Sequence, residues 1–231
     1  QTGMPPMQQQ SGGSMDNMKI EDDNDPFVPN TFTGSFTMEM QNYTDGKPSA
    51  QAPEVMHFWS SPDKTLMEFQ SIPGQGSEMK MLTDLKEKST CIMMTDSQGN
   101  KRAMKSHKKK ITYTGDADEA HITVTKETKM IDGHTCTKVT GTSKEGPWTA
   151  WVAKDIDANL SDLMGTGPMR GKKNTPDWKD VKGLPLEMDM TDKDGHTTMA
   201  MNIKDLKVGS VDPSVFSMDG YQMIEIPGMG Q

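Results

Sequence analysis

The sequence predicts a mainly antiparallel β protein built around one continuous sheet, on three observations. Short segments in which apolar and polar residues alternate recur along most of the chain, as is typical of half-buried strands. Asp-Gly dipeptides separate several of these segments, and such dipeptides accept the positive φ angles of tight hairpin turns. Helical periodicity is confined to one stretch, so consecutive hairpins are expected rather than β-α-β units.

Residues 1–30 are expected to form a flexible, low-complexity leader, because they mix Gln, Pro, Gly and Ser and show neither strand nor helix periodicity. Alternation begins at Thr31, after which Phe32, Phe36, Met38 and Met40 share one face of a strand. Further strands are expected near residues 54–60, 65–72, 77–83, 90–96, 101–105, 110–114, 121–131, 135–142, 149–154, 186–191, 197–208 and 221–226. This pattern indicates a single β domain of about 10–12 strands over residues 31–226, followed by a tail at 227–231.

Turn signals support this order of strands. Asp45-Gly46, Asp132-Gly133 and Asp194-Gly195 each stand between two alternating segments, and Gln98-Gly99-Asn100 adds a further turn. Consecutive hairpins of this kind build an antiparallel meander.

Residues 155–183 are expected to form a helical insertion in the sheet. Ile156, Leu160 and Leu163 recur at helical spacing, and Gly165 supplies a stop signal. A single amphipathic insertion must cover its apolar face. The prediction is therefore a short helical lid over the open, concave side of a curved sheet.

Methionine dominates the apolar positions, with 23 Met against 8 Leu. Four M-x-M pairs within expected strands each place two thioethers on one face of the sheet. They are Met38/Met40, Met79/Met81, Met188/Met190 and Met199/Met201. Such a face suits an adaptable apolar cavity and equally a plain core, and thioether sulfurs can also bind a soft cation such as Cu(I).

Charge and composition argue against nucleic acid as a partner and against a membrane-spanning helix. The net charge is −8, so nucleic acid would be repelled on average. No apolar run is longer than that of residues 91–94, which falls far short of the roughly 20 residues of a membrane-spanning helix. A basic group, Lys101, Arg102, Lys105, Lys108, Lys109 and Lys110, is interpreted as a solvated edge that blocks strand aggregation, or as a docking site for lipid head groups or an acidic partner.

The cysteine pair leaves two alternatives open. Cys91 and Cys136 could form one disulfide in an oxidising compartment, or remain two free buried thiols. The chain begins at Gln1 without an initiator Met, which indicates either a processed mature protein or a chain expressed after removal of its leader, and a cleaved secretory signal is expected.

Catalytic motifs are missing from the sequence. G-x-S-x-G, H-E-x-x-H and the Rossmann glycine pattern are not found, and the five histidines are scattered without metal-ligand spacing. His134 and Cys136 could in principle poise a thiolate, but neighbours on one strand are mostly packing partners. Asp192 and Asp194 begin like a calcium loop but lack its bidentate Glu, so a turn explains them. The chain is expected to be neither an enzyme nor a cofactor protein.

Several motifs together carry a family resemblance. They are the stretch 128–138 (TKMIDGHTCTK), the Trp148/Trp151 strand, Gly183-Leu184-Pro185-Leu186, Asp212-Pro213-Ser214-Val215-Phe216 and Gly220-Tyr221. Over roughly residues 31–226 the chain resembles an uncharacterised family of bacterial envelope proteins, similar to a branch of the LolA/LolB-like periplasmic lipoprotein carriers. The resemblance implies a curved, incomplete antiparallel β-barrel closed by short helices over an apolar cavity that holds acyl chains. Residues 1–30 depart from the N-terminal helix of those carriers.

The functional hypothesis is a non-enzymatic, exported protein of the periplasm or cell envelope that holds a lipid, a lipoprotein acyl chain or another apolar ligand in a methionine-rich cavity. An envelope partner protein is a further expectation. The proposed lining residues are Phe36, Met38, Met40, Met79, Met81, Met188, Met190, Met199, Met201 and Trp151, the last either plugging the sheet or lining the entrance. The alternatives are a copper-binding envelope protein using Met4, Met7, Met15 and Met18, and a structural module without a small ligand.

Overall fold

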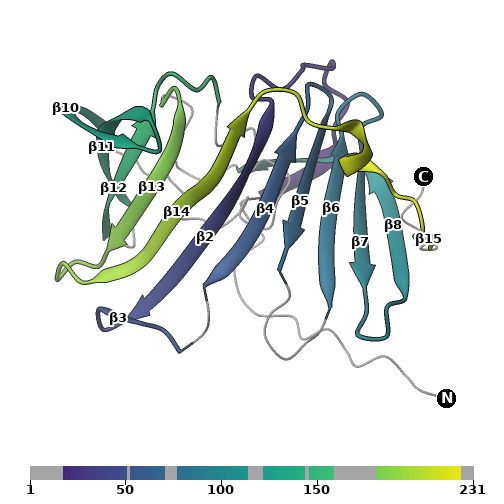
Figure 1. The fold of residues 1–231 in the computed structure, drawn as a ribbon, viewed down its shortest axis with the longest axis horizontal. Helices are drawn as coiled ribbons and strands as arrows, with labels where there is room; N and C mark the ends of the chain where they lie inside the picture. Colours follow the sequence, from purple (N-terminus) through teal and green to yellow (C-terminus); the bar gives the residue numbers. More distant parts are fainter. Residues whose placement is uncertain are drawn as a thin grey trace.

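One large, strongly curved sheet forms most of the protein in a computed structural model that describes residues 18–50, 53–70, 77–113, 122–143, 146–158 and 181–224 (Figure 1). The sheet has 13 strands in the order β10-β11-β12-β13-β14-β2-β4-β5-β6-β7-β8-β15, with β3 paired to β2. Its strands are β2 (Gly34–Thr44), β3 (Lys47–Pro48), β4 (Glu54–Ser60), β5 (Lys64–Phe69), β6 (Glu78–Asp84), β7 (Ser89–Thr95), β8 (Lys101–His107), β10 (Ile122–Ile131), β11 (His134–Ser143), β12 (Gly146–Ala153), β13 (Leu184–Thr191), β14 (Thr197–Val208) and β15 (Gln222–Met223).

Two antiparallel meanders make up this sheet. The first runs from β2 through β4 to β8, and the second runs from β10 to β14. They join where β14 pairs with β2, with Met201 opposite Met40 and Ile203 opposite Met38. The sheet does not close on itself, since β10 and β15 lie at its two ends. The predictions of an antiparallel sheet and of an incomplete barrel are therefore confirmed.

The predicted turns explain how the hairpins close. Asp132 and Gly133 have φ angles of 48° and 83° and join Ile131 to its partner His134. Asp45 and Gly46 do the same between β2 and β3, with φ angles of 52° and 70°. Because both central residues of such a turn need positive φ, Asp-Gly fits the tight hairpin connection well.

The C-terminal segment lies against part of one face of the sheet, here called the front face (Figure 1). Asp212 caps a short 3-10 helix, η3 (Pro213–Phe216), by accepting a hydrogen bond from the Ser214 amide. Phe216 then packs among side chains from β5 to β8, including Leu66, Leu82 and Met93. The D-P-S-V-F motif therefore anchors this segment.

A short parallel pair follows this anchor. Residues 222–223 form β15, which pairs with β8 in the parallel direction, with Met223 opposite Ala103. The strand expected at 221–226 is thus only two residues long within the described chain and does not extend the antiparallel meander.

The helical lid expected at 155–183 is not seen. Its described ends, residues 155–158 and 181–183, contain no helix, and the rest of the expected insertion lies outside the described residues. At the second end, Gly183 has a φ angle of +114°, and a Cβ there would lie 2.5 Å from the Ala153 carbonyl oxygen. Leu184 and Leu186 are both buried. The G-L-P-L motif therefore serves a close backbone approach at the start of β13.

A second, two-stranded sheet lies behind the large one in the view of Figure 1. It consists of β1 (Met18–Asp22) and β9 (Lys109–Tyr113), paired antiparallel with Ile20 opposite Ile111. The low-complexity composition of residues 1–30 did not predict β1. Within the described residues, no helix has the length and apolar character needed to cross a membrane.

Candidate functional site

The four M-x-M pairs all lie on one face of the large sheet, here called the methionine face. Across the junction of the two meanders, Met188 is opposite Met201, which is opposite Met40, and Met190 is opposite Met199. Directly opposed residues of neighbouring strands project to the same side. The register therefore joins three predicted pairs into one surface.

The fourth pair continues this surface through the first meander. Met38 lies opposite Met56, and Met56 lies opposite Phe69. Phe69 lies opposite Met79, and Met79 lies opposite Met94. One row thus runs across five strands, and a parallel row contains Phe36, Phe58, Met67 and Met81. The methionine face is opposite the front face, because Leu66 and Leu82, neighbours of Met67 and Met81, pack against the C-terminal segment.

Part of the methionine face is packed core. Met38, Met188, Met190 and Met201 are buried. Phe36 is also buried, and its ring stacks on Phe58 with centroids 4.8 Å apart. Buried side chains in a protein core are closely packed and leave little room for a ligand. These five predicted lining residues therefore form the packed core beneath the methionine face.

The other part, here called the open half, has accessible apolar side chains on β5 to β7. Met79 is 38% exposed, and Phe69, Met81 and Met94 are partly buried around it. Met40 and Met199 are partly buried as well, at the junction of the meanders. An apolar ligand would gain contact with the open half without displacing core residues.

The position of Trp151 differs from that of the methionine pairs, although Trp151 is partly buried against the same core cluster. Its cross-strand partner is Glu187, whereas its neighbour Ala150 is opposite Met188, so Trp151 projects from the other face. The Lys129 ammonium lies 4.5 Å from the centre of its ring, and Lys129 also pairs with Glu187. Trp151 therefore makes a cation–π contact on the opposite face, and the entrance role expected for it stays a prediction.

The alternative metal ligands are not placed by the structure. Met4, Met7 and Met15 lie outside the described residues, and only the backbone of Met18 is described, in β1. The Asp192, Asp194 and His196 group is a turn: the Asp192 carboxylate accepts hydrogen bonds from the Asp194 and His196 amides, both 2.9 Å long. These bonds lower the pKa of Asp192. They account for the arrangement as a capped turn.

The two cysteines are free and buried, and they lie on β7 and β11, which are far apart in the strand order. Burial raises the pKa of the Cys136 thiol to about 11, so the thiolate is suppressed at neutral pH. The described contact of the His134 ring is with Asp155, since its Nδ1 lies 2.8 Å from that carboxylate. The pair has the character of packing residues, not of an activated nucleophile.

A charge clasp joins the acidic end of the expected leader to the basic group. Asp22, Asp23 and Asp25 pair with Lys109, Lys108 and Lys110 respectively. Asp23 is 5% exposed and also lies 3.7 Å from Lys88. The basic group is thus largely neutralised from within the chain, which only a comparison of the two distant charged stretches could have indicated.

The pKa of Asp23 reflects this clasp. Burial acts to raise it, but hydrogen bonds from Lys108 and the Asp25 amide, with the charges of Lys108 and Lys88, hold the pKa below its usual value. A depressed folded-state pKa stabilises the clasp above the unfolded pKa of about 3.9 and loses this effect as the pH falls through the folded value. The clasp is therefore expected to hold at neutral pH and to weaken below about pH 4.

Replacing Asp23 with Asn is expected to loosen β1 from β9. A hydrogen bond between charged groups contributes roughly 1.5–3 kcal/mol, so amide exchange in β1 and β9 should rise by about 10- to 100-fold. Asp25→Asn is the matched control, because that carboxylate is 61% exposed and should change exchange by less than a few-fold. Equal amide exchange in the Asp23 and Asp25 variants would show that the buried Asp23 does not hold β1 against β9.

The fold and this surface define a predominantly antiparallel β protein with one methionine-rich apolar sheet face. The sequence matches the family described as "Domain of unknown function (DUF4412)" over residues 32–220, and the chain belongs to that family. No curated protein matches the sequence.

Several solved structures are similar at low level. PNGF-II is 14% identical with a TM-score of 0.41, and the match covers 84% of this chain but 32% of that one, so the chain spans about a third of its length. An uncharacterized conserved protein from Thermus thermophilus is 10% identical, with coverages of 84% and 91% and a TM-score of 0.45. A putative outer membrane lipoprotein-sorting protein domain from Vibrio parahaemolyticus is 11% identical, with coverages of 80% and 89% and a TM-score of 0.32.

Proposed function

We propose that this protein is a non-enzymatic binding protein that takes a lipid, an acyl chain or another apolar ligand on the methionine face. The observation that carries the proposal is the register, which aligns eight methionines from the four pairs on one side of the sheet. The envelope location, the delivery of lipoprotein acyl chains and an envelope partner protein belong to the same proposal and follow from the resemblance to the carriers.

The open half is the part of the face that binds in this proposal. Met79 and Met94 lie directly opposite each other, with Phe69 on the next strand, so an acyl chain can lie across three strands. Each methylene group buried there would contribute roughly 0.8 kcal/mol. Methionine side chains adapt to different shapes, so the face would accept chains of different length and branching.

The buried part of the methionine face supports the open half in this proposal. Buried Met38, Met188 and Met201 fix the curvature and position of the strands that carry the open half. A rigid support lowers the ordering cost of binding, while the exposed thioethers retain their freedom to adjust. The ligand site is therefore smaller than the set of lining residues predicted from the sequence.

The test compares two exposed methionines, one in the open half and one away from it. Met79→Asp places a carboxylate in the open half and is expected to weaken binding of a fatty acid by about 10-fold or more, because a charge cannot be buried against an acyl chain without cost. Met130→Asp is the matched control, since Met130 is 65% exposed on the edge strand β10. Binding would be measured by native mass spectrometry with palmitate and with lipid extracted from the purified protein.

Two outcomes would reject the proposal. One is the lack of any bindable apolar ligand in the unmodified protein. The other is an equal loss of binding in the Met79 and Met130 variants, which would show that the contact does not depend on the open half.

A further inference from the structure

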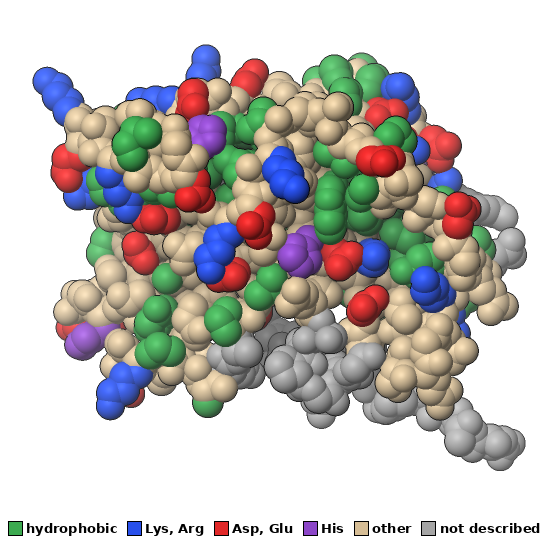
Figure 2. Space-filling view, viewed as in Figure 1, with side chains coloured by type: hydrophobic (Ala, Val, Ile, Leu, Met, Phe, Trp, Pro, Cys, Tyr) green, Lys and Arg blue, Asp and Glu red, His purple; other side chains and the backbone are tan. Residues whose placement is uncertain are grey.

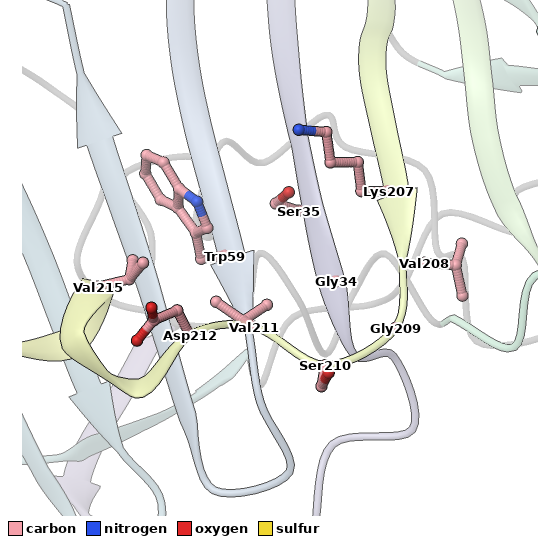
Figure 3. Close-up of a pocket in the computed structure, with 10 residues that line it drawn as sticks. All are labelled: Gly34, Ser35, Trp59, Lys207, Val208, Gly209, Ser210, Val211, Asp212 and Val215. Atoms are coloured by element: carbon pink, nitrogen blue, oxygen red, sulfur yellow. The ribbon is translucent and has the colours of Figure 1, made fainter.

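A cavity lies on the front face, opposite the methionine face, and is unrelated to the proposed function. It has a volume of about 220 Å³ and lies between the strand ends of β14, β2 and β4 and the C-terminal segment. Figure 3 shows Trp59, Ser35 and Lys207 along its sheet side, with Val211, Asp212 and Val215 on the C-terminal segment. It is smaller than the roughly 300–1,000 Å³ of most ligand pockets, so it fits a small molecule or the end of a longer one.

Three hydrogen-bond donors form one row across this cavity. Lys207 is directly opposite Ser35, and Ser35 is directly opposite Trp59. Neighbouring strands are about 4.8 Å apart, so an ammonium, a hydroxyl and an indole N–H stand side by side. None of the three side chains has a hydrogen bond or ion pair with another described residue. In this respect Lys207 differs from Lys204 on the same strand, which pairs with Glu39 at 2.5 Å.

A β-bulge puts Lys207 in this row. The register of β14 against β2 shifts between Lys204 and Lys207, and Asp205 within the bulge has a φ angle of 52°. Without the bulge, strand alternation would place Leu206 on the front face and Lys207 on the methionine face. The bulge instead leaves Leu206 against the core and turns Lys207 to the cavity.

The C-terminal segment supplies the apolar wall of the cavity. Val211 and Val215 pack with Trp59 in the front-face cluster, and η3 holds them in position. Acidic and basic side chains are scattered over the front face among polar and apolar ones (Figure 2). On this face the Lys80 ammonium lies 2.8 Å from the Glu68 carboxylate. Lys207 differs from Lys80 in that its ammonium has no ion pair with a described residue and lies beside an indole and two valines.

We infer that this cavity binds a small carboxylate with an apolar body. The carboxylate would accept hydrogen bonds from Lys207 Nζ, Ser35 Oγ and Trp59 Nε1, and the apolar body would lie on Val211, Val215 and the indole ring. Asp212 borders the opposite end, and its carboxylate already accepts a hydrogen bond from the Ser214 amide. It disfavours a second negative charge, so the ligand is a monocarboxylate.

The experiment uses phenylacetate as the probe and phenylacetamide as its uncharged counterpart, with the full-length chain. Titration followed by the Trp59 indole resonance in NMR, assigned through Trp59→Phe, is expected to show saturable binding of phenylacetate and at least about 10-fold weaker binding of the amide. Lys207→Met should weaken phenylacetate binding by about 10- to 100-fold, and Ser35→Ala should weaken it by a smaller factor. Lys204→Met, the control on the same strand, should leave binding unchanged.

Three results would overturn the inference. They are no saturable shift at millimolar phenylacetate, equal binding of the acid and the amide, and equal effects of the Lys207 and Lys204 variants. Since palmitate binding is read from the other face, the Met79 variant should bind phenylacetate normally. A failure of the methionine-face proposal and a failure of this one are therefore distinguishable.

Discussion

Replacing Phe58 with alanine is expected to lower the free energy of unfolding by about 3–5 kcal/mol, the range for deleting a buried phenylalanine. The Phe58 side chain is 0% exposed and stacks on Phe36 in the packed part of the methionine face. Its removal leaves a cavity between β2, β4 and β5, which a rigid sheet can close only in part. Urea unfolding followed by circular dichroism would measure the change.

Phe27→Ala provides the control for this prediction. Phe27 is 38% exposed, and the Lys86 ammonium lies 5.7 Å from its ring centre, so its removal should cost less than about 1 kcal/mol. Similar losses in the two variants would mean that the residues around Phe58 are not a tightly packed core.

Replacing Gly34 with alanine is expected to cost about 2–5 kcal/mol and to weaken the junction of the two meanders. Gly34 has a φ angle of +146°, and a Cβ there would lie 2.1 Å from the Lys207 carbonyl oxygen, a backbone atom that cannot rotate away. Strain in the backbone and overpacking each cost on the order of 1–3 kcal/mol. The same urea titration would measure it.

Gly220→Ala separates these two effects. Gly220 also has a positive φ angle, +81°, but a Cβ there would meet nothing within 4 Å. Only the conformational cost of about 1–2 kcal/mol is expected. If the Gly34 variant were no less stable than the Gly220 variant, the close approach of β2 and β14 would not be a structural requirement.

Local patterns predicted the strands well. The expected strands at 54–60 and 197–208 coincide with β4 and β14, because alternation and turn chemistry are properties of adjacent residues. Because residues two positions apart in a strand project to the same side, alternation also placed both members of each M-x-M pair on one face. Which faces of different strands coincide depends on register, and the sequence did not specify it.

The spacing of Trp148 and Trp151 shows how two residues of one strand come to lie on different faces. Trp148 and Trp151 are three residues apart, an odd spacing that puts them on opposite faces of a regular strand. This spacing was a usable signal, and the register confirms its meaning, with Trp148 opposite Met190 and Trp151 opposite Glu187. The role expected for Trp151, which came from its place beside the expected insertion, stays a prediction.

Long-range features were not predictable from one sequence. β1 pairs with a strand about 90 residues away through Asp22, Asp23 and Asp25, in a stretch whose composition indicates a flexible leader. The front cavity depends on a bulge at Asp205, which follows no Gly or Asp-Gly turn signal. Both arise from tertiary pairing, which overrides local propensity.

The most direct measurement for the central claim is photo-cross-linking with a palmitate analogue that carries a diazirine near its methyl end. If the methionine face binds acyl chains, peptide mapping should find the label on peptides that contain Phe69, Met79 or Met94, and excess palmitate should compete it away. Label spread evenly over the surface, or confined to the front face, would contradict the account.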